Sequence, residues 1–295
     1  MPTRPFYLVD VFAETKYAGN QLAVFRGADG LSDTEMQRFA KEMNYSETTF
    51  IISETPQQGG YEVRIFTPEA EIPFAGHPTL GTAYVIQREL VGAPVETLTL
   101  HLKSGPIPVT FTYRGTDADI LWMRQKPPTF EGSFDVRAVT PALGLDPSAI
   151  DTRFPIQEVS TGLPFIIVPL KTLADVNQAR IVRDAYLELI RNTPAKSILI
   201  FCPETIDPAH ALHVRVFADY FGVPEDPATG SANGCLAGYL VQHAYLGHEA
   251  IDLCVEQGYA IGRPSLLYLR AQTRAEGIEV AVGGKVVMVA RGEFV

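Results

Sequence analysis

One pattern occurs twice in this chain, and it constrains the fold more than any other feature of the sequence. Residues 63–85 read as a strand, a proline-broken turn, a glycine-containing corner and a helix, and residues 214–240 follow the same plan. Both strands carry Val-Arg-Ile/Val-Phe, and Pro73 and Pro224 each follow the first valine by ten residues. Because the copies lie 151 residues apart in a chain of 295, the sequence predicts two copies of one unit.

Composition narrows the class of protein. A chain of 295 residues favours two domains, and 46% hydrophobic with 20% charged residues is typical of a globular protein. A net charge of −10 without a Lys/Arg cluster argues against nucleic-acid binding. The sequence lacks an apolar run long enough for a membrane span, and it lacks a signal-peptide pattern. Three cysteines without CxxC spacing argue against disulfides or structural zinc, so a cytoplasmic protein is expected.

The first half is expected to consist largely of antiparallel strands around one buried helix. Ser32 and Glu35 have capping-box spacing at the start of an amphipathic helix that runs to about Met43. Residues 79–90 are small or apolar on every side, which is typical of a helix buried all round. Alternating and β-branched stretches predict strands at residues 6–12, 21–25, 48–52, 61–66, 95–102, 107–113 and 120–125.

The second half repeats this plan after a predicted linker at residues 126–132. We expect a helix that starts at Thr140 with Pro141 in its first turn, one helix over residues 175–191, and a small-residue helix over residues 231–243. Strands are expected at residues 165–170, 197–202, 213–217, 266–270, 278–282 and 285–291. The sequence thus indicates an α+β fold with two similar domains, 1–127 and 128–283, and the last strand, about 284–295, is expected to join the first domain.

The glycine-containing corner of the first copy is a candidate binding site. Gly76 permits close backbone approach, Pro78 suits a first helical turn, and the N–H groups of a helix start attract anions. His77 at this corner has the chemistry to donate to a ligand or to hold a proton. The alternative interpretation is a helix cap with a partly exposed histidine.

The corresponding stretch of the second copy, residues 225–232, strengthens the functional interpretation. Its Asp, Thr and Ser residues are good helix caps, so a plain cap is the alternative. Because the stretch repeats the first corner, we expect two helix starts, one from each domain, to converge on a cleft between the domains. Their dipoles favour a carboxylate, and domain interfaces are where small-molecule pockets lie.

Further polar residues are candidates outside the repeat. Glu47 lies between a predicted helix end and an apolar strand, where partial desolvation suits general acid–base use, and an exposed turn residue is the alternative. Asp10 and Asn20 are interpreted as structural hydrogen-bonding residues in strands, and Asn20 also as a residue that lines the cleft. Nucleotide-binding, zinc-protease and serine-hydrolase motifs do not occur, and the six histidines lack metal-ligand spacing. We therefore expect neither a cofactor nor a metal.

Assembled, these stretches resemble the phenazine-biosynthesis isomerase (PhzF-like) family over essentially the whole chain. The similar segments are residues 9–25, 44–50, 64–85, 226–240 and 283–294. The resemblance implies the diaminopimelate epimerase fold, in which two pseudo-symmetric α+β domains each wrap antiparallel strands around a central helix. It also implies a cofactor-independent isomerase that moves a proton or double bond in a small, anionic, carboxylate-bearing metabolite. The family prototype acts on trans-2,3-dihydro-3-hydroxyanthranilate.

The resemblance assigns a role to each candidate residue. Glu47 would be the acid/base that removes a proton from a substrate carbon and returns it elsewhere on the same skeleton. Three residues would orient the substrate and assist the transfer: His77, Asp226 and Ser231. The substrate-binding residues would be Asn20, Gly76, Pro78, Thr229 and Gly230, with the two glycines supplying backbone N–H groups to the substrate carboxylate.

Two other functions stay open on the sequence. An amino-acid racemase or epimerase is one, because epimerases of this fold place a cysteine in each helix-start motif. Those positions are read here as Ala75 and Ala232, and Cys235 lies within the helix, so the sequence favours the isomerase. A non-catalytic metabolite-binding protein is the other, although pure binding needs no general base. A homodimer is expected, as is usual for enzymes of this size. We expect neither a nucleic-acid partner nor a membrane partner.

Overall fold

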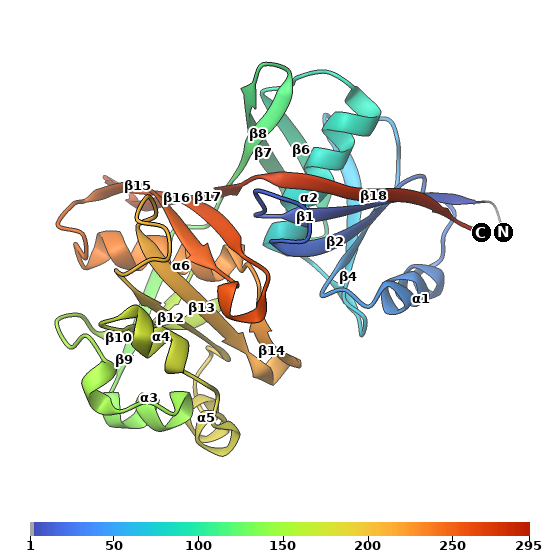
Figure 1. Cartoon of the computed structure of the whole chain (residues 1–295). Coiled ribbons are helices and arrows are strands. Elements are labelled where there is room, and N and C mark those ends of the chain that lie inside the picture. Colours follow the sequence, from blue (N-terminus) through green and yellow to red (C-terminus); the bar gives the residue numbers. More distant parts are fainter. Residues whose placement is uncertain (1–2) are drawn as a thin grey trace. The chain divides into compact units, whose positions relative to one another are not determined.

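The computed structural model describes residues 3–295 as two compact units (Figure 1). Unit 1 consists of the chain up to Met123 together with Gly283–Val295, and unit 2 is Arg124–Val282. The chain therefore passes from unit 1 to unit 2 after Met123 and returns after Val282. Within the described residues, no helix is both long enough and apolar enough to cross a membrane.

Unit 1 is built largely from strands. They are β1 (Arg4–Val11), β2 (Asn20–Phe25), β3 (Thr48–Ile51), β4 (Tyr61–Phe66), β5 (Glu71–Ile72), β6 (Thr97–Leu102), β7 (Gly105–Arg114), β8 (Asp117–Arg124) and β18 (Val286–Phe294). The helices are α1 (Asp33–Met43) and α2 (Gly76–Ile86), which continues into the π-helical turn η1 (Gln87–Val91). The strands pair in the series β18–β1–β2–β3–β4–β6–β7–β8, and β5 pairs with the end of β4.

Unit 2 repeats this construction with additional helices. Its strands are β9 (Thr129–Phe134), β10 (Ile156–Ser160), β11 (Pro164–Pro169), β12 (Ser197–Cys202), β13 (Leu212–Ala218), β14 (Val223–Asp226), β15 (Ala250–Gln257), β16 (Ser265–Arg274) and β17 (Gly277–Gly284). Its helices are α3 (Val136–Leu143), α4 (Leu173–Gln178), α5 (Arg183–Ile190) and α6 (Gly230–Gln242), with short 3-10 turns η2 (Pro147–Ala149), η3 (Asp219–Phe221) and η4 (Tyr259–Ile261). The strands pair in the series β9–β10–β11–β12–β13–β15–β16, with β14 beside β13.

The two units share one pairing pattern, which confirms the duplication predicted from the sequence. The only parallel pairs of unit 1 among the described strands, β2–β3 and β4–β6, correspond to β11–β12 and β13–β15 of unit 2. The register agrees as well, because Phe66 pairs with Thr48 and Phe217 pairs with Ile198 at equivalent strand ends. The strand β18, which completes the series of unit 1, follows the hairpin β16–β17 along the chain. In the same way β9, which completes the series of unit 2, follows the hairpin β7–β8.

A helix without a polar face lies within each unit. In α2 every residue from His77 to Ile86 is buried, and in α6 the exceptions to burial are Ser231 and Gln242. Helix α2 contacts β1, β2, β3 and β6, and α6 contacts the equivalent strands β10, β11 and β15 as well as β16. This burial accounts for the small and apolar composition of both helices and confirms the predicted central helices.

The predicted helix start at Thr140 is wrong. Helix α3 begins four residues earlier, at Val136, because the Asp135 side chain accepts a hydrogen bond from a first-turn N–H group and caps the helix there. Pro141 lies in the last turn, and Gly144 in the left-handed conformation ends the helix. The proline therefore sits near the helix end rather than at its beginning.

Two further local predictions are wrong because tertiary pairing overrides the local signal. The helix expected over residues 175–191 is divided into α4 and α5. Between them, the N–H groups of Arg180 and Val182 donate to carbonyl groups of Leu143 and Ala142 at the end of α3, so the backbone cannot also form a continuous helix. The expected linker at residues 126–132 is partly the strand β9, which pairs with β10.

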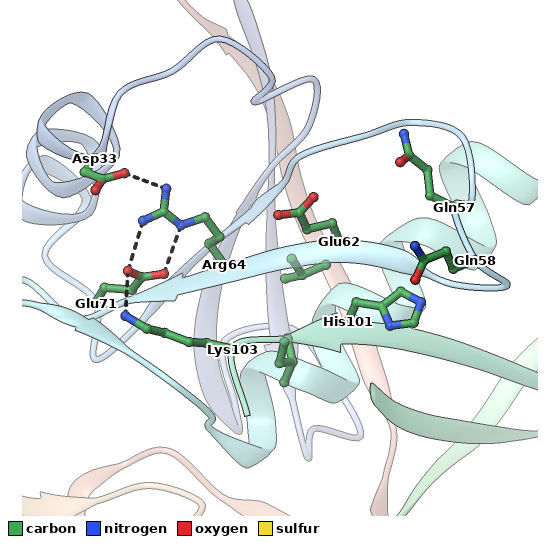
Figure 2. A pocket seen from close by; sticks show the side chains of 10 residues that line it. Asp33, Gln57, Gln58, Glu62, Arg64, Glu71, His101 and Lys103 are labelled. Atoms are coloured by element: carbon green, nitrogen blue, oxygen red, sulfur yellow. Dashed lines mark hydrogen bonds and ion pairs between the residues drawn. The ribbon is translucent and has the colours of Figure 1, made fainter. Parts of the chain in front are cut away.

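In unit 1, an arginine anchors the hairpin that leads into α2 (Figure 2). The Arg64 guanidinium donates from Nε and Nη2 to both carboxylate oxygens of Glu71, at 2.9 Å each, and lies 5.1 Å from the Phe66 ring centre. Its Nη1 atom donates to Asp33 at the start of α1, and Lys103, directly after β6, contacts Glu71. Planar, bidentate pairing of this kind fixes orientation as well as distance, so β5 is held against β4.

Unit 2 contains the same arrangement at the equivalent positions. Arg215 donates from Nε and Nη2 to the two oxygens of Glu225, at 3.0 and 2.7 Å, and lies 4.9 Å from the ring centre of Phe217. Its Nη1 atom donates to the carbonyl oxygens of Val176 and Ala179, both at 2.8 Å, where α4 ends. Each helix start is therefore preceded by a hairpin that an arginine clamps in place.

We expect Arg215→Met to destabilise the protein strongly. The variant keeps the aliphatic stem but leaves Glu225 without its partner in a site where Arg215 is only 8% exposed, and breaking a buried pair in this way costs about 3–5 kcal/mol. The control is Arg274→Met, whose partner Glu279 and own side chain are both more than half exposed, with an expected cost below about 1 kcal/mol. Urea denaturation of both variants measures this, and equal losses would contradict the assigned role.

Candidate active site

Glu47 and His77 lie together in unit 1. Glu47 follows the left-handed Asn44 that ends α1 and directly precedes β3, and His77 is the second residue of α2. The Glu47 Oε2 and His77 Nε2 atoms are 3.4 Å apart, with side-chain exposures of 18% and 7%. The carboxyl group is therefore partly removed from water, and the histidine is buried rather than partly exposed.

Burial fixes the protonation state of His77. It lowers the pKa of the imidazole from 6.5 to about 3, and a hydrogen bond with the Gln21 backbone opposes this shift only in part. The ring is therefore neutral near pH 7. Since Nε2 has no hydrogen-bond partner among residues 3–295, the bond to Gln21 is assigned to Nδ1–H. Nε2 then carries a lone pair on the side of Glu47 and is able to accept a proton or a hydrogen bond.

A tight turn brings the start of β2 to this position. Asn20, the first residue of β2, is only 2% exposed, and β2 contacts α2. Gly19 precedes it with φ +64°, and a Cβ atom there would lie 2.3 Å from the Val11 carbonyl oxygen. A side chain at this position would be excluded both by conformation and by space. The turn thus places Asn20 and the Gln21 backbone beside the helix start that carries His77.

The described starts of α2 and α6 lack both a side-chain cap and an acidic residue in the first turn. Helix α5, as described, also lacks a side-chain cap, but it carries Asp184 in its first turn. Helices α1, α3 and α4 are capped by the side chains of Ser32, Asp135 and Thr172. At the described starts of α2 and α6, no side chain caps the helix, and the first turn contains no acidic residue. The first-turn N–H groups at Gly76 and Gly230 are therefore not taken by a side-chain cap, and the positive ends of both helix dipoles remain available to an anion.

The second motif has its own hydrogen-bond network. Asp226 ends β14, and Thr229 occupies the N-cap position of α6. The Thr229 hydroxyl group donates to Asp226 Oδ2 at 2.5 Å and does not cap the helix, so the alternative of a plain side-chain cap does not apply to Thr229. Gly230 is buried at the first helical position, and Ser231 follows it with partial exposure. The structure thus brings Asp226 and Thr229 together within unit 2, as it brings Glu47 and His77 together within unit 1.

Two residues of this network escaped the sequence analysis. Gln257, at the end of β15, bonds to the Asp226 carbonyl oxygen and to both the N–H and the hydroxyl group of Thr229. Asn233 of α6 donates to the Thr229 carbonyl and to Gln257. The sequence feature that could have indicated Gln257 is the pair of polar residues Glu256 and Gln257, at the end of a strand and directly before a glycine.

The observed helix starts correct one of the two positions at which epimerases of this fold place a cysteine. Ala75 is the N-cap residue of α2, and the equivalent residue of α6 is Thr229 rather than Ala232. Neither position holds a thiol. Cys235 lies inside α6, where burial raises the pKa of its thiol to about 12. A thiolate is the reactive form of cysteine, so Cys235 is not suited to exchange protons near neutral pH.

Unit 1 also has a polar hollow that lies away from Glu47 and His77. Its volume is about 570 Å³. Its lining includes Arg64, Glu71, Lys103 and His101 together with neighbouring glutamine and carboxylate side chains (Figure 2). Within the described part of the chain, its lining includes neither Glu47 nor His77. Its charged groups are largely those of the Arg64 clamp, which pair with one another. Among residues 3–295, no group of three or more His, Cys, Asp or Glu side chains is arranged to hold a metal.

Comparison with known proteins identifies the family. The family model described as "Phenazine biosynthesis-like protein" matches residues 9–292. The chain is 34% identical over 284 residues to the trans-2,3-dihydro-3-hydroxyanthranilate isomerase of Pseudomonas aeruginosa, with 95% of each chain covered. A crystal structure of a PhzF-family phenazine biosynthesis protein from Bacillus anthracis matches with a TM-score of 0.91 and 28% identity, over 100% of both chains.

A more distant structural match concerns the fold alone. A hydroxyproline epimerase of Agrobacterium vitis, 12% identical, matches with a TM-score of 0.64 over 99% of this chain and 92% of that one. Together with the duplicated strand series, these findings confirm the predicted α+β, epimerase-like fold. The chain belongs to the PhzF-like family of phenazine-biosynthesis-like proteins, and it is an isomerase of that class.

The buried, neutral His77 predicts a specific pH dependence of stability. In the unfolded chain this histidine binds a proton below pH 6.5, whereas in the folded protein it does so only near pH 3. Acidification from pH 6.5 to 5 should therefore lower the free energy of unfolding, with a slope that approaches ~1.4 kcal/mol per pH unit from this group. His77→Gln should remove that slope, and the exposed His248→Gln should not. Parallel pH curves for wild type and His77→Gln would contradict the assignment.

Proposed function

We propose that this protein is a cofactor-independent isomerase that moves a proton, and with it a double bond, within a small carboxylate-bearing metabolite. The observation that carries the proposal is the Glu47–His77 pair, with 3.4 Å between Oε2 and Nε2, beside an uncapped helix start. The named activity of the Pseudomonas relative supports a compound of the trans-2,3-dihydro-3-hydroxyanthranilate type as the substrate. Self-association as a homodimer stays a prediction.

In this proposal Glu47 is the single acid/base. Its carboxylate takes a proton from one substrate carbon, and the electron pair of that C–H bond shifts into the conjugated system. The carboxylic acid then returns the proton to another carbon of the same skeleton, so the enzyme and the proton count are unchanged at the end. Partial burial limits exchange with water during this interval, and transfer through one positioned group accounts for about 10²–10⁴-fold of rate.

His77 assists because it is neutral. Its Nε2 lone pair accepts a hydrogen bond either from protonated Glu47 or from a donor group of the substrate. The ring does not introduce a fixed positive charge, so it stabilises the acid form of Glu47 between the two transfers. Asp226 and Ser231 complete the proposed set by orienting polar groups of the substrate.

The substrate carboxylate binds the helix starts in this proposal. N–H groups at Gly76 and Gly230 supply donors that no side chain of the described chain occupies as a cap. Fixed N–H donors and helix dipoles stabilise charge that spreads into the carboxylate as the proton leaves. In this proposal Asn20 and Pro78 contribute substrate contacts from unit 1, and Thr229 contributes them from unit 2. Two-base racemisation is not favoured, since the N-cap positions hold Ala75 and Thr229 instead of thiols.

Glu47→Gln tests the assignment directly. The variant keeps the size of the side chain and removes its proton-transfer chemistry, so isomerisation of trans-2,3-dihydro-3-hydroxyanthranilate and deuterium incorporation from D₂O should fall by about 10³-fold. Glu42→Gln, on an exposed position of α1, is the matched control and should retain both. Nuclear magnetic resonance of the recovered compound locates the label on carbon. Equal wash-in of deuterium by wild type and Glu47→Gln would sink the proposed role.

A further inference from the structure

We propose that Gln257 is a positioning residue whose side-chain amide holds the Asp226–Gly230 turn in its reactive arrangement. The inference rests on the proposed function, because Asp226 and Gly230 belong to the proposed set of site residues. The hydrogen bonds that link Gln257 to the proposed site go to residues of this turn. It would act through the hydrogen bonds that it makes to Asp226 and Thr229.

Every hydrogen-bonding group of the Gln257 amide is used. Nε2 donates to the Asp226 carbonyl oxygen at 2.8 Å and to Thr229 Oγ1 at 3.0 Å. Oε1 accepts from the Thr229 N–H at 3.2 Å and from Asn233 Nδ2 at 2.8 Å. The side chain is fully buried. A buried amide that is satisfied on all sides is rigid, and it specifies one arrangement of the groups around it.

These bonds set the direction of the Thr229 hydroxyl group. Thr229 Oγ1 accepts from the Gln257 amide, so its own hydrogen is directed to Asp226 Oδ2, 2.5 Å away. This chain of donors fixes one oxygen of Asp226 and thereby the orientation of the whole carboxylate. It also explains why the Thr229 side chain does not cap α6, which leaves the helix start to an anion.

The duplication shows that the fold does not require an amide here. Gln257 lies opposite Val214 in the β13–β15 pairing. In unit 1 the equivalent pairing places Tyr61 opposite Leu100, and the same register continued by two residues places Leu102 in the position of Gln257. Leu102 is buried like its counterpart. One copy of the unit therefore has an apolar residue where the other buries a polar one, and burying an amide is costly without a compensating set of hydrogen bonds.

The adjacent residue brings the turn into direct contact with this strand end. Gly258 has φ +78°, and a Cβ atom there would lie 2.5 Å from the Pro227 carbonyl oxygen and 2.4 Å from that of Arg263. Only glycine fits in both conformation and space. The Asp226–Gly230 turn thus packs on the backbone of Gly258 while the Gln257 amide bonds to it from the neighbouring position.

Two variants separate positioning from simple packing. Gln257→Leu reproduces the residue of unit 1, and Gln257→Glu keeps the shape and the Oε1 acceptor but loses both donations from Nε2. Gln257→Leu removes the acceptor of the Thr229 N–H, so we expect amide hydrogen exchange at residues 228–231 to quicken by at least about tenfold in that variant. Gln257→Glu keeps this acceptor and should quicken the exchange less. For both variants the loss of the Nε2 donations should affect turnover. We expect kcat for trans-2,3-dihydro-3-hydroxyanthranilate to fall by about 100-fold with a KM changed by less than about threefold. Gln272→Leu, at an exposed position of β16, should leave both measurements unchanged.

A double-mutant comparison tests the route through Thr229. Thr229→Val removes the hydroxyl group, so adding Gln257→Leu to that variant should lower kcat much less than it does in the wild type. Additive losses of kcat, or unchanged exchange at residues 228–231 in Gln257→Leu, would overturn the proposal. A wild-type kcat in either Gln257 variant would also overturn it. Should both Gln257 variants fail to fold, Thr229→Val alone decides, and an unchanged kcat in it would also overturn the proposal. If the wild-type protein does not turn over trans-2,3-dihydro-3-hydroxyanthranilate, that result counts against the proposed function. The hydrogen-exchange measurement then still tests whether Gln257 positions the Asp226–Gly230 turn.

Discussion

A helix that is apolar on every side interacts with a ligand only through its ends, and this constraint governs both units. The residues of α2 and α6 are used almost entirely to fill the space inside the strands, so chemistry is left to the loop and first turn at each helix start. The clamps made by Arg64 and Arg215 fix the hairpins that deliver the chain to those starts. Strand series, central helix and clamp are the same in both units, which is why a duplicated sequence pattern predicted a duplicated site motif.

The duplication accounts for the scaffold, and the differences between the copies account for the chemistry that we propose. Glu47 directly precedes the strand residue Thr48 that pairs with Phe66, and the equivalent residue of unit 2 is Ser197. Unit 1 therefore carries the carboxylate and the buried imidazole, whereas unit 2 carries Asp226 and a hydroxyl-rich turn. An acid–base reaction that moves one proton needs one group with a matched affinity for it, and a pair of identical half-sites would supply two.

The features that the sequence predicts correctly are those that depend on interactions between residues close together in the chain. The capping box at Ser32, the helix end near Met43 and the apolar central helices are determined by neighbours in the chain, and the structure confirms them. The division of residues 175–191 into two helices depends on carbonyl groups at the end of α3, which are distant in sequence. Glu47 was a candidate from its local context, yet its distance to His77 depends on how β3 and α2 pack. Gln257 was missed because its hydrogen-bond partners lie about 25–30 residues away in the sequence. A local sequence pattern does not indicate contacts at that separation.

The protonation state of His77 links this architecture to the proposed chemistry. A charged imidazole 3.4 Å from a carboxylate would form an ion pair and favour the ionised form of Glu47 throughout the reaction. Burial in the first turn of α2, at a helix start whose dipole also disfavours a cation, keeps the ring neutral. The Gln21 backbone then holds the remaining ring proton on Nδ1, so that Nε2 accepts rather than donates. The same burial that stabilises the central helix thus produces a partner that tolerates Glu47 both with and without its proton.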